Sequence, residues 1–204
     1  MSRRPNTEQR RVEIVYALLA AMAEHGYEKA TIQLIAQKAG LAPGLLHYHF
    51  KTKAEILLEL VKTLAALSHQ RYVEFAENAS TAEEKLHAYI NARLGKGQGA
   101  DPRAVAAWVV IGAEAVRQPD VRAVFQEAVQ AEMTLVHCLL TACMKDKRKQ
   151  IKNVQRLTAG LLAFMEGAFQ LASAAPDVMP AGYAAITAIQ LVQRFIEGET
   201  GSSK

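Results

Sequence analysis

The sequence of 204 residues predicts an all-α fold of about nine helices. Apolar residues recur at spacings of three and four along nearly the whole chain, as they do on one face of an α-helix. No alternating strand pattern persists, and valine and isoleucine are scattered among good helix formers such as alanine, leucine, glutamate and lysine. Half of the residues are hydrophobic, which excludes a disordered chain.

The N-terminal part of the chain predicts four helices with recognisable ends. Gly26 and Gly40 end the first and second, because glycine readily adopts the conformation that follows a helix. Pro43 begins the third, since proline suits a first helical turn, and Thr52 with Glu55 makes a capping box for the fourth. The expected ranges are 7–25, 32–39, 43–50 and 52–78.

The rest of the chain predicts five further helices. Ser80 or Thr81 caps the first of these, and Asp101 followed by Pro102 opens the second. The glycine-rich segment 95–99 separates these two helices, and Pro119 interrupts the chain again. The expected helices end near residues 94, 117, 144, 174 and 197, and the charged segment 145–149 is expected to be a loop.

Residues 31–58 carry the most informative pattern. They predict a short helix, a tight turn and a second short helix, which together make a helix-turn-helix motif. The first helix of such a motif braces across the DNA backbone, and the second faces base edges in a major groove about 12 Å wide. Ile35 and Ala36 supply the buried side of the first helix, and Leu46 and Phe50 that of the second.

This segment resembles the N-terminal domain of the tetracycline-repressor (TetR) family of transcriptional regulators. The resemblance implies a helix-turn-helix DNA-binding domain in residues 1–52 and a larger helical ligand-binding and dimerisation domain in residues 53–204. It also implies a ligand-responsive repressor that binds a palindromic operator in double-stranded DNA as a homodimer. The residues that carry the resemblance are Thr31, Ile35, Ala36, Ala39, Gly40, Leu41, Pro43, Gly44, Leu46, His49, Phe50, Lys53 and Leu57.

The resemblance further implies which residues contact DNA. Threonine, tyrosine, histidine and lysine side chains are expected to contact phosphates, and the first turn of the second helix is expected to lie against bases. Ala42 stands where the family often has serine or threonine, Leu45 is placed to meet a thymine methyl group, and His47 replaces a tyrosine. The expected DNA-binding residues are Thr31, Ala42, Pro43, Gly44, Leu45, His47, Tyr48, His49 and Lys53.

Two other interpretations of the second helix of the motif are weaker. Tyr48 would instead be a half-buried tyrosine that braces the domain. His47 and His49 would instead bind a metal ion, but side chains two residues apart on a helix diverge by about 200°. No metal is therefore expected.

The last two helices predict a dimer interface. The helix from 157 to 172 is apolar nearly all round and needs cover on both faces, and small residues on one side permit close helix–helix approach. With the last helix it would form a four-helix interface between two subunits. The alternative is that the glycines pack inside one chain. The expected interface residues are Gly160, Ala163, Gly167, Ala184, Ala188, Leu191 and Phe195.

The middle helices hold candidate residues for an unknown small-molecule effector. The resemblance extends faintly to the betaine-regulator branch of the family, which suggests a cationic or small metabolite. Each aromatic residue or methionine is also explained as plain core. A buried carboxylate in these apolar helices needs a partner, which would be a cationic ligand, His137 or an arginine; the alternative is that the carboxylate reaches solvent. The candidates are Tyr89, Trp108, Glu114, Met133, His137, Phe164, Met165, Glu166 and Phe169.

Other classes of protein lack support in the sequence. It contains no phosphate-binding loop, dinucleotide fingerprint, zinc-protease motif or nucleophile elbow, so no enzyme activity and no cofactor are expected. Cys138 and Cys143 are expected to be small buried hydrophobes in a reduced cytoplasm. The apolar segment 157–175 nearly reaches the length of a membrane span, about 20 residues, but it carries Glu166 and is expected to be a buried helix without membrane contact.

The net charge of +4 points only weakly to nucleic acid. Residues 1–62 carry nine lysines and arginines against six acidic residues, and residues 145–156 carry six against one. The second cluster is expected to be a solvated loop, with a second nucleic-acid surface as the alternative. The function therefore depends on the motif at 31–58, and a transcriptional activator or a ligand-independent DNA binder of the same fold remains the alternative.

Overall fold

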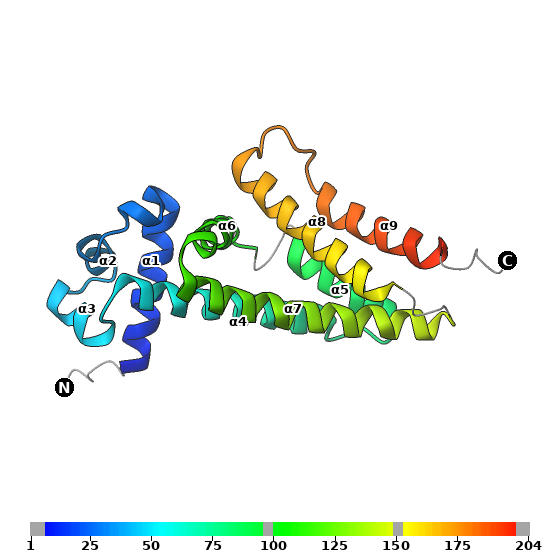
Figure 1. The fold of residues 1–204 in the computed structure, drawn as a ribbon, viewed down its shortest axis with the longest axis horizontal. Coiled ribbons are helices and arrows are strands. Elements are labelled where there is room, and N and C mark those ends of the chain that lie inside the picture. The colour runs from blue at the N-terminus through cyan, green and yellow to red at the C-terminus, as the bar shows by residue number, and fades with distance from the viewer. Residues whose placement is uncertain (1–6, 96–99, 149–152, 199–204) are drawn as a thin grey trace. The chain divides into compact units, whose positions relative to one another are not determined.

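The computed structural model describes residues 7–95, 100–148 and 153–198, and all regular secondary structure in these ranges is helical (Figure 1). The described residues form nine helices, as the sequence predicts. They are α1 (Thr7–Lys29), α2 (Ile32–Lys38), α3 (Pro43–His49), α4 (Lys53–Ala76), α5 (Ala82–Leu94), α6 (Pro102–Arg117), α7 (Pro119–Asp146), α8 (Val154–Ala174) and α9 (Tyr183–Gly198).

Side-chain caps explain why these helices begin where they do. The hydroxyl oxygens of Thr31 and Thr81 accept hydrogen bonds from backbone N–H groups in the first turns of α2 and α5, and Asp101 does the same for α6. The expected break after residue 25 is present inside α1, where Gly26 has a φ of 76° and interrupts the helical backbone.

The described helices group into two compact units. Unit 1 contains α1, α2, α3, α6 and the first parts of α4 and α7; unit 2 contains α5, α8, α9 and the remaining parts of α4 and α7. The boundary falls after Ala65 within α4 and after Ala128 within α7. Packing thus groups α6 with the N-terminal helices because it lies along α1. The expected functional division at residues 52 and 53 stays a prediction.

The core of unit 1 fixes the helix-turn-helix motif onto α1 and α4. Ile14, Leu18, Ile35, Leu46 and Ile56 are completely buried. Each such side chain contributes about 1.5–3 kcal/mol through burial of its apolar surface. Because α1 packs against both α2 and α3, the orientation of the motif is set by this core.

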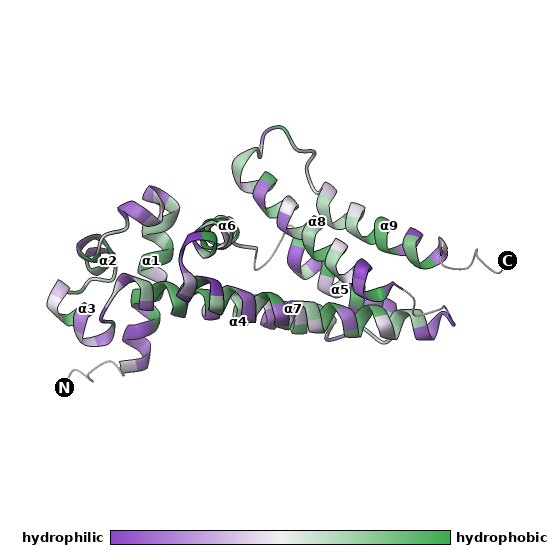
Figure 2. Cartoon of the chain, in the orientation of Figure 1, coloured by the Kyte–Doolittle hydropathy of each residue, from purple (hydrophilic) through white to green (hydrophobic). Residues whose placement is uncertain are grey.

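In unit 2, α8 packs against α5 and α9, which run beside it (Figure 1). Tyr89, Ile90, Met165 and Val192 fill the interior between these helices. Among the described residues, α8 is the one helix long and apolar enough to cross a membrane. Only 28% of this apolar window is buried, so packing against α5 and α9 accounts for part of its apolar character, and the expectation of a buried helix holds for one side of α8 only. Apolar residues also follow α9 (Figure 2).

Three details differ from the sequence-based expectations. Cys143 is buried as expected, but Cys138 is exposed, because it lies on the solvent side of α7. The helix α7 continues through Asp146, two residues beyond its predicted end, and so includes the first two residues of the charged segment. Lys147 of that segment is paired with Glu83 at 2.8 Å, and residues 149–152 lie outside the described ranges.

Candidate functional site

A glycine ends α2 and sets the turn of the motif. Gly40 has a φ of 65°, a backbone conformation that L side chains rarely adopt. The Gly40 N–H donates to the Gln37 carbonyl at 3.1 Å, and the Leu41 N–H donates to the Ala36 carbonyl at 2.9 Å. This pair of bonds is the Schellman motif. It aims the chain directly into the N-terminal turn of α3.

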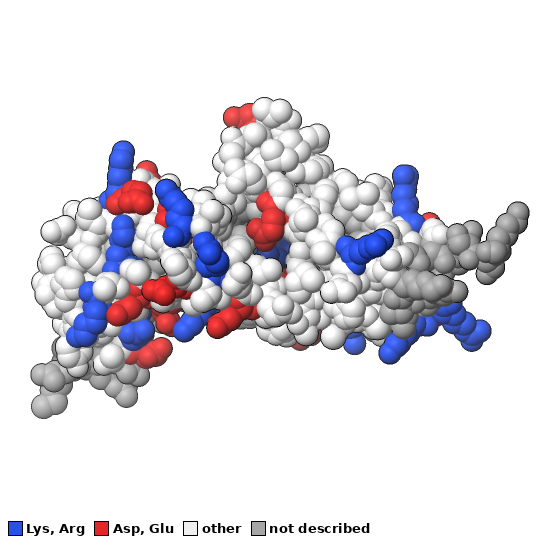
Figure 3. Space-filling view, viewed as in Figure 1, with Lys and Arg blue, Asp and Glu red and all other residues white. Residues whose placement is uncertain are grey.

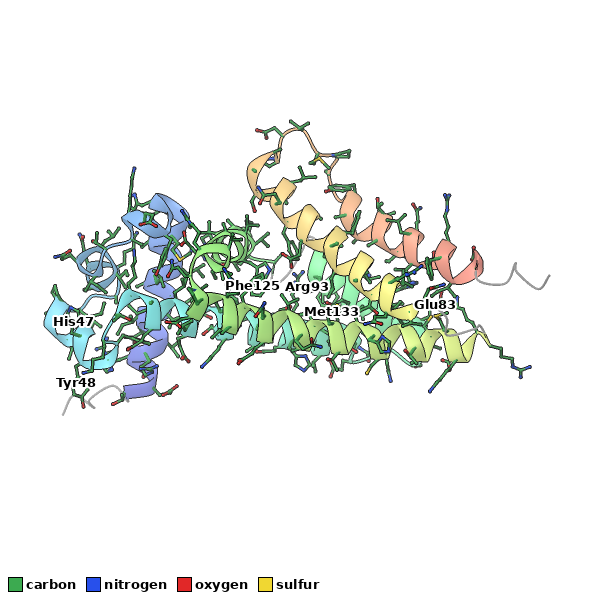
Figure 4. The ribbon with its side chains drawn as sticks, viewed as in Figure 1. His47, Tyr48, Glu83, Arg93, Phe125 and Met133 are labelled. Atoms are coloured by element: carbon green, nitrogen blue, oxygen red, sulfur yellow. The ribbon has the colours of Figure 1, made fainter. Side chains whose placement is uncertain are left out.

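One face of α3 is anchored and the other is open. Leu46 is completely buried, whereas Leu45 is 47% exposed and Tyr48 is 71% exposed. His47 and Tyr48 project from α3 towards solvent (Figure 4). The expected DNA-contacting residues Thr31, Ala42, Pro43 and Gly44 are exposed as well. These residues are therefore all accessible, with Thr31 directly before α2 and the others directly before or along α3.

Gly44 lies in the first turn of α3 without a reason inside the protein. A Cβ atom added there would meet nothing within 4 Å among the described atoms. Glycine in a helix is less favourable than alanine by about 0.8–1 kcal/mol. Packing and backbone geometry of the described chain thus leave this glycine unexplained.

Arg11 of α1 secures the far end of α3, a role that sequence reasoning missed. Its Nη1 donates to the His49 carbonyl at 2.7 Å, and its guanidinium lies 4.0 Å from the centre of the Phe50 ring. Its Nη2 is 3.7 Å from a Glu59 carboxylate oxygen in α4. One side chain thereby connects α1, α3 and α4. The partner residues lie 38 or more positions away, so no local pattern reveals the contact.

Lys53 begins α4, as expected, and its side chain contacts the end of α1. Its Nζ donates to the Tyr27 carbonyl at 2.9 Å and to the Glu28 carbonyl at 3.4 Å. The ammonium also lies 4.1 Å from the centre of the Tyr27 ring. In this arrangement the positive charge stabilises the carbonyl end of α1, and the expected phosphate contact stays a prediction.

His49 is half-buried beside the exposed Tyr48. The two rings meet edge-on with centroids 5.2 Å apart. Within the described residues the Nδ1 atom of His49 is buried and has no hydrogen-bond partner. Its ring therefore packs at the edge of the motif, and Tyr48 is the more accessible of the two.

The charge on this unit is mixed. Figure 3 shows lysine and arginine side chains interspersed with aspartate and glutamate on the face in view of the N-terminal helices. Lys38, for example, contacts the Glu24 carboxylate at 2.7 Å. The structure thus agrees with the weak charge signal of the sequence.

The expected effector residues fall into both units. Trp108 and Glu114 belong to unit 1, where the Trp108 ring packs against Phe125 with centroids 4.9 Å apart. Glu114 is buried, and its carboxylate accepts from Arg117 at 2.9 Å and from Gln118 at 2.6 Å. Of the partners considered for this carboxylate, the structure contains the arginine.

The other expected effector residues lie in unit 2 at different depths. Tyr89, Met165 and Phe169 are buried, and Met133, Phe164 and Glu166 are half-buried. Met133 is on α7 (Figure 4). His137 is exposed on that helix, so its expected position inside the domain is wrong. Since α7 is apolar on more than one side, its rotation could not be read from the sequence.

Unit 2 encloses a polar cluster that sequence reasoning missed. The Tyr89 hydroxyl donates to the Glu132 carboxylate, and Arg93 Nη1 donates to the Ser68 hydroxyl oxygen at 2.7 Å. Arg93 Nε lies 3.9 Å from a Glu132 oxygen. Burial, and then the negative charge of Glu132, raise the pKa of Tyr89 far above its usual range. Tyr89 is therefore a neutral hydrogen-bond donor.

The expected dimer residues are mostly accessible. Gly160, Ala163, Gly167 and Leu191 are exposed, and Ala184 and Phe195 are half-buried. A Cβ atom at Gly160 or Gly167 would meet nothing within 4 Å in the described chain, so these glycines do not pack inside unit 2. Ala188 is completely buried within the unit, which corrects its assignment to the interface.

Comparisons with known proteins agree with the helix-turn-helix and with the second unit. Residues 14–60 match the family described as "Bacterial regulatory proteins, tetR family", and residues 82–200 match "BetI-type transcriptional repressor, C-terminal". The chain is 28% identical over 161 residues to the HTH-type transcriptional regulator BetI of Rhizobium meliloti (strain 1021), which is 78% of this chain and 76% of the relative.

Solved structures share the fold. A transcriptional regulator from Rhodococcus sp. Rha1 has a TM-score of 0.80 and 21% identity, with 92% of this chain and 96% of the other covered. A transcriptional regulator from Saccharomonospora viridis, solved in complex with choline, has a TM-score of 0.75 and 22% identity, with 93% and 96% covered.

The two family matches together span α1 to α9, and the second covers more than half of the chain. The first match contains the complete helix-turn-helix motif and the buried residues of α1 and α4 that form its core, such as Ile14, Leu18 and Ile56. The relatives are transcriptional regulators, a class without enzymatic activity. The chain thus belongs to the TetR family of bacterial regulatory proteins, with a BetI-type repressor C-terminal region, and is a helix-turn-helix, DNA-binding transcriptional regulator.

Proposed function

We propose that this regulator is a ligand-responsive repressor that acts in the cytoplasm and binds a palindromic operator as a homodimer. The observation that carries the proposal is the open face of α3, with a glycine in its first turn that the fold itself does not need. A recognition helix must bring its backbone close to base edges in the major groove, and glycine permits that approach.

The surface of the motif suggests a division of work among its residues. The Thr31 hydroxyl and the N-terminal N–H groups of α2 and α3 suit phosphate contacts. Gly44 and Leu45 suit contacts with base edges, including a thymine methyl group. His47 and Tyr48 suit contacts with the DNA backbone on either side of these bases. Arg11 and Lys53 hold α3 and α4 against α1, and their role is to position the recognition helix α3.

The dimer is supported by the exposed small residues of α8 and α9. Gly160, Ala163 and Gly167 offer a side on which a second helix can approach closely, and Leu191 extends this apolar surface. Such a face in a two-fold dimer meets its own copy. Two motifs then meet two half-sites separated by about 34–36 Å or a multiple of it.

The regulation follows from a shift between two states of the dimer. The half-site spacing of the operator selects the state in which the two recognition helices match it. An effector that binds the other state better lowers operator affinity by its difference in affinity for the two states. An effector of equal affinity for both states leaves operator binding unchanged, however tightly it binds.

Selection of bound fragments from genomic DNA tests the proposal. We expect recovery of a palindrome whose half-sites repeat at the spacing of one DNA turn or a multiple. Sedimentation of the complex should give two chains per operator. Recovery of unrelated fragments, or binding of one chain to a single half-site at full affinity, contradicts the proposal. A reporter gene behind the recovered operator should be repressed, and activation would contradict the assignment of direction.

A further inference from the structure

We propose that the polar cluster inside unit 2, made by Ser68, Arg71, Tyr89, Arg93 and Glu132, binds the carboxylate of a small organic acid, and that this acid is the effector. This inference rests on the ligand-responsive function proposed above and names the chemical class of the ligand. All five residues belong to unit 2, on α4, α5 and α7. Arg93 projects from α5 (Figure 4).

Two arginine side chains converge between α4 and the end of α5. Arg93 reaches from α5 to the Ser68 hydroxyl on α4, at 2.7 Å. Arg71, one turn further along α4, reaches back to the Gly95 carbonyl just after α5, at 3.2 Å. Ser68 and Arg71 lie three residues apart and share one face of α4. Both arginines therefore connect α4 with the end of α5 within unit 2.

Arg71 and Arg93 each keep a buried donor without a hydrogen bond in the described part of the chain, and that of Arg93 has only an ion-pair contact, at 3.9 Å, with a Glu132 oxygen. The Nε atoms of Arg71 and Arg93 are buried and have no hydrogen-bond partner among the described residues. A buried donor left unmade costs about 1–3 kcal/mol. Burial also lowers the pKa of Arg71 from its usual value. An oxygen acceptor from a ligand would satisfy these N–H groups.

The same cluster is unsuited to a cationic effector. Glu132 is the nearby carboxylate, and its oxygens already accept from the Tyr89 and Ser68 hydroxyl groups. The ring of Phe169 is the aromatic face beside it, and the guanidinium of Arg93 lies over that ring at 4.9 Å. A ligand cation binds through a carboxylate and aromatic faces. Here the protein's own arginine occupies both.

A second carboxylate contributes to the charge balance. Glu166 acts on Tyr89 and raises its pKa together with Glu132. Two carboxylates and two guanidinium groups leave this interior without excess charge, so hydrogen bonding decides which ligand fits. The unsatisfied groups in the described part of unit 2 include two strong donors, and a carboxylate accepts from arginine N–H groups in short, charge-assisted bonds.

Thermal melting of the full chain, measured without DNA, tests the site directly. Sodium octanoate and sodium benzoate are the acidic probes, and choline chloride is the cationic probe. We expect at least one acid to raise the melting temperature and to weaken operator binding about tenfold, within the usual range for coupled sites. Choline should do neither. A response to choline, or no response to either acid, overturns the inference.

Variants assign the response to the cluster. Arg93→Met and Arg71→Met should each abolish the melting shift caused by the acid. Arg103→Met is the matched control, because that side chain is 67% exposed in unit 1, and it should keep the shift. If Arg93→Met unfolds the chain, Arg71→Met decides the test alone. An acid response that survives in a folded Arg71→Met variant contradicts the site.

The outcome separates this inference from the function it rests on. Ligand binding is measured by melting without DNA, and operator binding is measured without ligand. Failure to bind any palindrome would contradict the proposed function and leave the melting result intact. Operator binding that responds to choline and to neither acid would support regulation by a ligand and refute the carboxylate.

Discussion

Replacing Gly44 with alanine separates what the fold needs from what DNA needs. The substitution adds one methyl group to the first turn of α3, where it would meet nothing within 4 Å in the described chain. Alanine is also the better helix former, so we expect the free energy of unfolding to rise by about 0.5–1 kcal/mol. For a chain of this length that corresponds to a rise in melting temperature of about 1–4 °C.

The effect on DNA should have the opposite sign. If the backbone at Gly44 lies against base edges, the methyl group must displace the helix or the base. A disturbed base contact costs about 1–3 kcal/mol, as a mismatched base pair does. We therefore expect operator affinity to fall between about fivefold and 150-fold at constant salt, and affinity for random duplex DNA to change little.

Fluorescence anisotropy with the selected operator and with a random duplex measures both quantities. Gly112→Ala is the matched control, because a Cβ atom there would stand 3.6 Å from Phe125, an ordinary van der Waals distance, within the same unit. That control should gain stability and keep its operator affinity. A Gly44→Ala variant that binds operator as the wild type does would refute the close approach of the Gly44 backbone to the bases. A destabilised variant would refute the conclusion that the protein has room for a methyl group at this position.

Four other substitutions test the remaining roles. Arg11→Ala should lower the free energy of unfolding by about 1–2 kcal/mol, because the contacts with His49 and Phe50 are lost. It should also weaken operator binding without changing the slope of log affinity against log salt concentration. A slope smaller by one would instead assign Arg11 to a phosphate. Lys53→Ala should likewise keep the salt slope of operator binding, because the Lys53 ammonium is held by the Tyr27 carbonyl. A slope smaller by about one would show that Lys53 contacts a phosphate. Leu45→Ala should change the base preference recovered by selection, and an unchanged preference removes it from the readout. Gly160→Leu should shift the chain towards monomer in sedimentation, and an intact dimer would exclude this face of α8 from the interface.

The parts of the fold that the sequence predicts are those with local causes. Thr31, Thr81 and Asp101 begin helices because each side chain reaches an N–H group two or three residues on. Gly40 ends α2 because the turn needs a positive φ. These causes operate within one helical turn, so the residues that interact are close together in the sequence and the helix ends can be predicted from it.

Non-local contacts account for what could not be predicted. Tyr89 and Glu132 are 43 residues apart, and Arg93 meets Ser68 across 25. Helix rotation is equally hidden where a helix is apolar on several sides. Ala188 therefore proved to be buried and Cys138 exposed, against expectation. The grouping of α6 with α1 is also a property of packing that no motif announces.

The residues whose contacts the fold explains differ from those on which the two proposals rest. Lys53 and Glu114 looked functional in the sequence, yet each has strong partners within its own unit. Gly44 and the Nε atom of Arg71 lower stability without a compensating contact in the described chain, and the Nε atom of Arg93 lacks a hydrogen bond there and has only its ion pair with Glu132. Their combined cost is several kcal/mol, a large fraction of the roughly 5–15 kcal/mol that stabilises a typical domain. A sequence retains such costs where binding recovers them, which is why both proposals rest on these residues, DNA for the glycine and an acid for the arginines.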